Sequence, residues 1–153
     1  MTKVIDSVRM LCIGCVAVLA TVFGDFWFLF AAFLALNVVD YITGSMKARF
    51  TKTEKSDKGA AGIIKKVGYW VAISISFFVG VSFEQMGKTI GINLKFVELA
   101  GWFTLATFIV NECRSILENL IVLGVPVPGF LIKGLEVAAN AVNNVTDKDG
   151  GKK

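Results

Sequence analysis

Two carboxylates interrupt long apolar segments of this sequence, and they are the first candidates for chemistry. Asp40 lies in an apolar segment that begins at Phe26, and Glu112 lies in another that begins near Phe96. A carboxylate pair can act in acid–base catalysis when a suitable partner completes the set. The chain has no histidine, and we find no nucleophile beside a base, no phosphate-cradling glycine loop and no metal-ligand cluster. We therefore predict no catalytic, cofactor-binding or metal-binding residues and no enzyme activity.

Cys12 and Cys15 have the Cys-x-x-Cys spacing of some zinc and redox sites. They lie in an apolar segment, however, and no second pair of ligands accompanies them. We interpret them as small apolar residues of a helix.

Polar residues recur around both carboxylates at helical spacing. In the first segment, Asn37, Asp40, Tyr41, Gly44 and Lys47 share one helical face. The second segment has a matching row, consisting of Gly101, Thr104, Thr107, Asn111, Ser115 and Glu118, with Glu112 and Arg114 on its flanks. We call these two rows the polar seam.

The polar seam has two interpretations. A carboxylate within a membrane costs several kcal/mol unless it is paired or hydrated. Asp40 and Glu112 are expected at a depth close to that of Arg114, Lys65 and Lys66, so the seam can be a static ion-pair network that fixes helix register. Alternatively, it lines water when subunits assemble.

Composition favours a membrane protein over an apolar, soluble helical protein, which is the alternative. Of the 153 residues, 55% are hydrophobic and 18% are charged, and the mean hydropathy is +0.68. The charges gather in residues 47–66 and after Lys133. The longest uncharged run, residues 67–83, is 17 residues, just short of the usual ~18 for a spanning helix. We attribute the interruptions to charges that face a bundle interior or a helix end.

The predicted fold is an all-α, integral membrane helical bundle of four transmembrane helices, with three as the alternative. The transmembrane domain covers residues 1–124, with spans at about 4–23, 26–46, 67–86 and 96–117. A cleavable signal peptide is the rival interpretation of the first span. The segment between Asn111 and Gly124 is expected to emerge from the membrane.

The remaining part, residues 125–153, begins with a break. Pro126 and Pro128 cannot continue a helix. A short amphipathic helix is predicted at 130–145, followed by a polar tail at 146–153.

The segment 47–66 is predicted to be a basic loop on the cytoplasmic side of a bacterial cytoplasmic membrane. Its basic residues are Lys47, Arg49, Lys52, Lys55, Lys58, Lys65 and Lys66. Basic loops remain in the cytoplasm, and two spans on either side would return both termini there. Such a loop suits anionic lipid headgroups, so we predict membrane lipids and no nucleic acid as partners.

Small residues recur at every fourth position of the third predicted span, at Gly68, Ala72, Ser76 and Gly80. Such a stripe lets another helix approach closely. The approaching helix can belong to the same subunit or to a second one.

Several segments, taken in order, resemble the phage holin family that includes the clostridial toxin-release holin. They are Asp-Tyr-Ile-Thr-Gly at 40–44, Lys-Ala-Arg at 47–49, Ser-Asp-Lys-Gly at 56–59 and Gly-Ile-Ile-Lys-Lys-Val at 62–67. A second block is similar as well, with Asn-Glu-Cys-Arg-Ser-Ile-Leu-Glu-Asn at 111–119 and Gly-Val-Pro-Val-Pro at 124–128. The chain departs from the family pattern at 129–132, which is apolar where relatives are basic.

The resemblance implies a function. Holins of this family form homo-oligomers in the bacterial cytoplasmic membrane and open lesions at a programmed time. A cell-wall hydrolase, or in some relatives a toxin, then escapes, which leads to lysis or secretion. The link to that cargo is functional and not a direct contact.

Two other classes of function remain open. One is a small multi-span transporter or channel that works as a dimer. The other is a structural subunit or an antiholin that binds a partner through the helix at 130–145.

Overall fold

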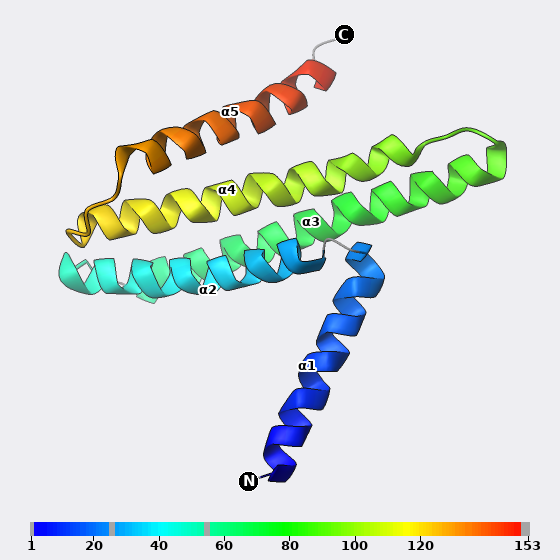
Figure 1. The fold of residues 1–153 in the computed structure, drawn as a ribbon. Helices are drawn as coiled ribbons and strands as arrows, with labels where there is room; N and C mark the ends of the chain where they lie inside the picture. The colour runs from blue at the N-terminus through cyan, green and yellow to red at the C-terminus, as the bar shows by residue number, and fades with distance from the viewer. Residues whose placement is uncertain (1, 25–26, 54–55, 151–153) are drawn as a thin grey trace. The chain divides into compact units, whose positions relative to one another are not determined.

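The computed structural model describes residues 2–24, 27–53 and 56–150, and this part of the chain is helical with no strand. The α-helices are α1 (Thr2–Phe23), α2 (Trp27–Phe50), α3 (Ser56–Ile90), α4 (Leu99–Val122) and α5 (Gly129–Gly150), and a short 3-10 helix, η2 (Lys95–Glu98), precedes α4 (Figure 1). The predicted all-α fold is confirmed. The chain divides into two compact units, residues 1–35 and 36–153, and each is described by itself.

Three helical segments of the described chain are long and apolar enough to cross a membrane, namely Trp27–Phe50, Gly59–Ile90 and Lys95–Val122. The shortest has 24 residues, which corresponds to about 36 Å of helix against a hydrocarbon core of about 30 Å. Large apolar side chains project from α3, with Ile75 57% and Phe78 73% exposed. A membrane-spanning helical protein is confirmed. The helix α1 is not among the three, so the fourth span stays a prediction.

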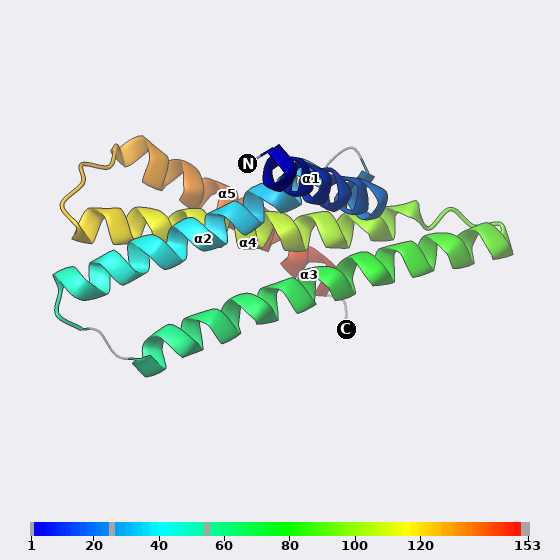
Figure 2. The same ribbon diagram turned by 90° about the horizontal axis from the view of Figure 1, so that it is seen from below.

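The second unit is built on an antiparallel pair of helices, α3 and α4, which are joined by residues 91–94 and η2 (Figures 1 and 2). Phe77 meets Trp102 edge-on with ring centroids 4.9 Å apart, and Tyr69 stacks on Phe108 at 4.1 Å. Ile73 and Leu105 are fully buried in the same unit. Aromatic pairs of this kind add to the dispersion energy that holds helices together in lipid.

The stripe of small residues contributes to this pair within one subunit. A Cβ at Gly80 would lie 2.9 Å from the Cα of Glu98, so only glycine permits the observed approach of α3 to η2. One turn earlier, the Thr104 hydroxyl donates to the Ser76 hydroxyl at 3.1 Å. At the other end of the stripe, a Cβ at Gly68 would meet nothing within 4 Å. The stripe therefore packs inside the chain at its Ser76–Gly80 end and is open at Gly68.

The helices extend further than expected into the segment 47–66. Lys47 and Arg49 lie in the last turn of α2, where cations interact favourably with the helix dipole, and α3 already begins at Ser56. Most of the segment 47–66 is therefore helical, since α2 ends at Phe50 and α3 begins at Ser56, and its place as the cytoplasmic segment between two spans stays a prediction. Lys52 lies between these two helices with a positive φ of 53°. Lys55 is outside the described residues, and Lys58 is described only in its backbone.

The C-terminal half contains α4 and a last helix that is longer than expected. The helix α4 continues without a break through Asn111 to Val122, and the emergence of the segment after Asn111 from the membrane stays a prediction. Gly124, at φ +82°, ends it, and the amides of Gly124 and Val125 donate to the carbonyls of Ile121 and Leu120, the Schellman pattern of a glycine stop. The helix α5 packs along α4 and runs to Gly150, so residues 146–150 are helical where a tail was predicted.

Replacing Gly80 by alanine should destabilise the α3–α4 pair. The added Cβ has no room beside the backbone of Glu98, and overpacking of this kind costs about 1–3 kcal/mol. The matched control is Gly68→Ala on the same stripe. We expect thermal unfolding in detergent micelles at a lower temperature for the Gly80 variant only. Equal melting temperatures of the two variants would contradict the intrachain packing of Gly80.

Candidate functional site

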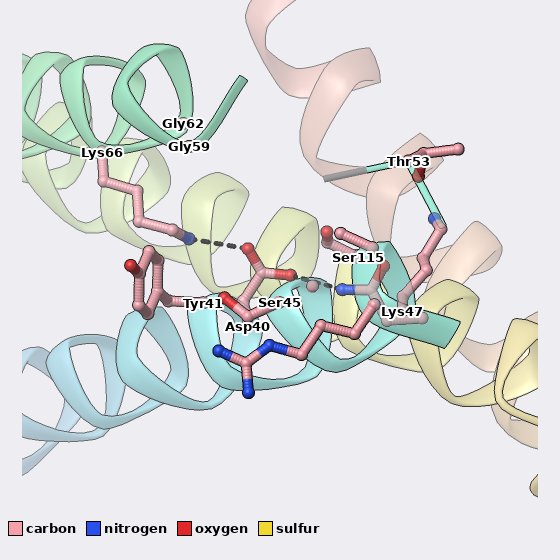
Figure 3. A pocket seen from close by; sticks show the side chains of 13 residues that line it. Asp40, Tyr41, Ser45, Lys47, Thr53, Gly59, Gly62, Lys66 and Ser115 are labelled. Atoms are coloured by element: carbon pink, nitrogen blue, oxygen red, sulfur yellow. Dashed lines mark hydrogen bonds and ion pairs between the residues drawn. The ribbon is translucent and has the colours of Figure 1, made fainter. Parts of the chain in front are cut away.

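One charged residue from each of three helices meets in a single buried cluster. The Lys66 ammonium of α3 lies 2.9 Å from Oδ2 of Asp40 on α2 and is also bonded to Oε2 of Glu112 on α4. Figure 3 shows Lys66 pointing from α3 to Asp40. The side chains of Lys66 and Asp40 are 16% exposed and that of Glu112 is 4% exposed. We call these three residues the ion cluster.

Two uncharged side chains complete the hydrogen bonding of the ion cluster. The amide of Asn119 on α4 donates to Oδ1 of Asp40 at 3.1 Å and to the Thr43 hydroxyl at 3.3 Å. That hydroxyl donates in turn to the carbonyl of Val39, 2.9 Å away and one turn earlier in α2. Both carboxylate oxygens of Asp40 therefore have a donor, one from α3 and one from α4.

The charges in the ion cluster explain why it is built this way. A buried carboxylate is costly without a partner, and the cost is greater in a membrane, where solvation by bulk water is absent. Lys66 is within bonding distance of both carboxylates and can compensate only one negative charge. The Asn119 amide and the Thr43 hydroxyl supply further dipoles beside Asp40. The arrangement ties α2 to the α3–α4 pair through polar contacts.

Two cavities lie beside the ion cluster. The larger, of about 670 Å³, is bounded by the C-terminal turns of α2 and the start of α3, and its lining includes Tyr41, Lys47, Gly59, Gly62 and Ser115. The smaller has a volume of about 410 Å³, and its lining includes Tyr69, Asn111, Arg114, Ser115 and Glu118. Asp40 and Lys66 border both cavities.

Only some residues of the polar seam lie on the buried face of the helices. In α4 the buried residues are Gly101, Leu105, Glu112, Ile116 and Asn119. Glu112, predicted as a flank, is therefore at the centre, whereas Asn111 and Glu118 are exposed. The buried face is rotated by one residue, or about 100°, so that the apolar side chains of Leu105 and Ile116 are buried together with Glu112 and Asn119.

Other seam residues have separate local roles. The Thr107 hydroxyl donates to the carbonyl of Phe103, one turn earlier in α4, and the Thr104 oxygen lies 2.7 Å from the carbonyl oxygen of Ala100. Arg114 and Glu118 form an exposed pair at 2.9 Å. On α2, Asn37 is buried and Tyr41 is half exposed.

The neighbouring basic residues differ in their surroundings. Lys65 lies over the Tyr69 ring at 5.7 Å from its centroid, outside the ion cluster. Lys66, predicted as a loop residue at the depth of the carboxylates, is the residue that joins them. In lipid, a lysine near the end of a span normally extends towards the headgroups, so only its neighbours reveal that it turns inward.

Sequence reasoning missed Thr43 and Asn119. A signal for both was present, since Thr43 follows Asp40 by three residues and Asn119 follows Glu112 by seven, which places each on the face of its carboxylate. Both are uncharged, and neither interrupts an apolar run in the way that Asp40 and Glu112 do.

Replacing Lys66 by methionine should destabilise the chain, because it leaves two buried carboxylates without their cation. Removing one partner of a buried ion pair costs about 3–5 kcal/mol, and the partial exposure of the pair favours the lower end. Lys65→Met is the adjacent control, with an expected loss of about 0.5–1 kcal/mol. The measurement is thermal unfolding in micelles. Combining Lys66→Met with Asp40→Asn and Glu112→Gln should restore most of the stability. If it does not, unpaired buried charge is not the cause of the loss of stability in the Lys66 variant.

Comparison with known proteins supports the resemblance noted in the sequence. The sequence model of the bacteriophage holin family matches residues 17–140. A probable holin of Bacillus phage phi105 is 31% identical over 119 residues, which cover 76% of this chain and 78% of that protein.

Bacterial relatives are similar to the chain to the same degree. An uncharacterized protein of Halalkalibacterium halodurans is 29% identical over 79% of this chain and 85% of its own length. Another, from Clostridium perfringens, is 30% identical over 80% of this chain and 83% of its own length. No solved structure matches the fold. Because the family model spans most of the sequence, including all three residues of the ion cluster, the chain belongs to the bacteriophage holin family.

Proposed function

We propose that this membrane protein is a holin that oligomerises in the bacterial cytoplasmic membrane and opens lesions through which a cell-wall hydrolase or a toxin escapes. The observation that carries the proposal is the ion cluster, in which three helices are joined by buried charges. Family membership and the probable holin of phage phi105 support it. The proposed role is formation of a passage and involves no catalysis.

The proposed orientation places the end of α2 and the start of α3 on the cytoplasmic side. The basic residues at this end are the basis, because Lys and Arg remain in the cytoplasm. If α1 also crosses the membrane, both termini are cytoplasmic.

The proposed mechanism is an exchange of partners at the ion cluster. In a single subunit, Asp40 and Glu112 are compensated by Lys66 and by Asn119. If α2 moves away from the α3–α4 pair during assembly, the same groups can be hydrated in a shared water-filled passage. Both states satisfy the charged groups, one by pairing and one by water, so the equilibrium between them can be shifted by association.

The surface for association must lie where the chain does not already use its own packing. The Gly80 end of the small-residue stripe is occupied by Glu98 of the same chain, which leaves the Gly68 end for a second subunit. The exposed apolar side chains of α3 adjoin it. Homo-oligomer formation through this part of α3 is therefore part of the proposal.

Induced expression in a bacterium tests the function directly. Membrane potential and release of a cytoplasmic enzyme are followed together after induction. We expect a delay followed by abrupt loss of potential with release of the enzyme. Loss of potential without enzyme release would instead indicate a small channel. Neither event, together with co-purification of a partner, would indicate a structural or antiholin subunit.

Glu112→Gln should change the time of lysis, because it removes one of the two carboxylates that hold Lys66 while keeping the side-chain shape. Glu118→Gln is the control, since Glu118 is exposed and pairs only with Arg114 within its own helix. We expect cells that express the Glu112 variant to lyse at a time at least twofold different from cells that express the parent. Cells that express the Glu118 variant should lyse at the same time as those with the parent. Identical lysis by all three at equal membrane levels would mean that the ion cluster is structural only.

A further inference from the structure

The larger cavity has a basic lining, and the proposed formation of lesions does not explain that lining. It is about 670 Å³ in volume, lies between the C-terminal turns of α2 and the first turns of α3, and has three basic residues and one acidic residue in its lining. The acidic residue, Asp40, already accepts from Lys66 and Asn119. The basic residues of the lining other than Lys66 are Lys47 and Arg49.

We propose that this cavity binds the phosphate-bearing headgroup of an anionic phospholipid. Lys47 and Arg49 supply the charge, and an arginine guanidinium suits phosphate oxygens in particular. The hydroxyls of Ser45 and Thr53 in the lining are further donors. Basic pockets between transmembrane helices near the membrane surface are typical sites for anionic headgroups.

Three glycines in the lining provide the room for this ligand. Gly44, Gly59 and Gly62 border the cavity, and a Cβ at Gly59 or Gly62 would meet no atom within 4 Å. At positions 59 and 62, therefore, no side chain of α3 fills the cavity. A headgroup can approach the backbone of α3 closely there.

The surroundings favour a lipid over a soluble anion. Exposed apolar side chains adjoin the lining residues in both helices, with Ile42 51% and Met46 52% exposed on α2 and Ile63 50% exposed on α3. Acyl chains can lie against these side chains while the phosphate occupies the basic cavity. A free phosphate would gain nothing from them.

The first test compares lipid binding by two double variants of the full chain. Delipidated protein in neutral detergent is titrated with phosphatidylglycerol or phosphatidylcholine, and bound lipid is counted by native mass spectrometry. We expect the parent to prefer phosphatidylglycerol, and Lys47→Gln with Arg49→Gln to lose about 25-fold in affinity for it. The control, Lys88→Gln with Lys133→Gln, removes the same charge outside the cavity and should retain the preference. Equal losses in both double variants would overturn the site in favour of diffuse attraction.

A second pair of variants tests the cavity without changing charge. Gly62→Leu should fill the space and reduce phosphatidylglycerol binding at least tenfold, whereas Gly68→Leu, in the same helix but outside the lining, should not. Circular dichroism of each variant checks that the helices persist. Unchanged binding by the Gly62 variant would overturn the proposal.

Competition with inorganic phosphate distinguishes a lipid headgroup from a soluble phosphate as the ligand of the cavity. We expect millimolar phosphate at constant ionic strength to leave phosphatidylglycerol bound. Displacement of the lipid by phosphate would overturn the assignment to a lipid and indicate a site for a soluble anion. The readout is binding, so it is independent of whether the protein opens lesions.

Discussion

The Lys66 ammonium is bonded to two carboxylates that come from two other helices, and in a membrane none of the three charges can be left alone. This constraint determines the depth at which α2, α3 and α4 meet. The aromatic contacts Phe77–Trp102 and Tyr69–Phe108 hold α3 against α4, whereas the attachment of α2 runs through Asp40 and Thr43. Ring contacts therefore join α3 to α4, and polar contacts link α2 to both helices.

The polar contacts at the ion cluster suit the proposed change of assembly within lipid. Apolar surfaces gain little free energy from contacting one another in a hydrocarbon medium, so Gly80 and Gly101 contribute through close approach to Glu98 and to Phe77. Polar contacts persist only while each charge has a partner or water. The proposed exchange of pairing for hydration, and the proposed headgroup site at Lys47 and Arg49, both place the responsive chemistry at the same end of the bundle.

Much of the site was predictable in kind but not in position. Asp40 and Glu112 stand out because each interrupts an apolar run, and Lys66 follows from the basic segment near them. Periodicity in α4 was ambiguous, because polar residues occur on adjacent faces at both 111 and 112. The burial of Leu105 and Ile116 resolves it, and this depends on the shape of α3. Asn119 was missed because the predicted row ended at Glu118, which lies one residue away on the adjacent, exposed face.

The helical class, the membrane location and the family could all be predicted from the order of the residues, because they depend on apolar content, on the spacing of the charged interruptions and on ordered short motifs. Helix ends were less accessible, as the helical start of α3 at Ser56 shows, since polar residues form helices and loops alike. The contact of Lys66 with both Asp40 and Glu112 became evident only in the folded chain. That contact depends on distances between helices, and residue order along one helix carries no information about the neighbour that a long side chain reaches.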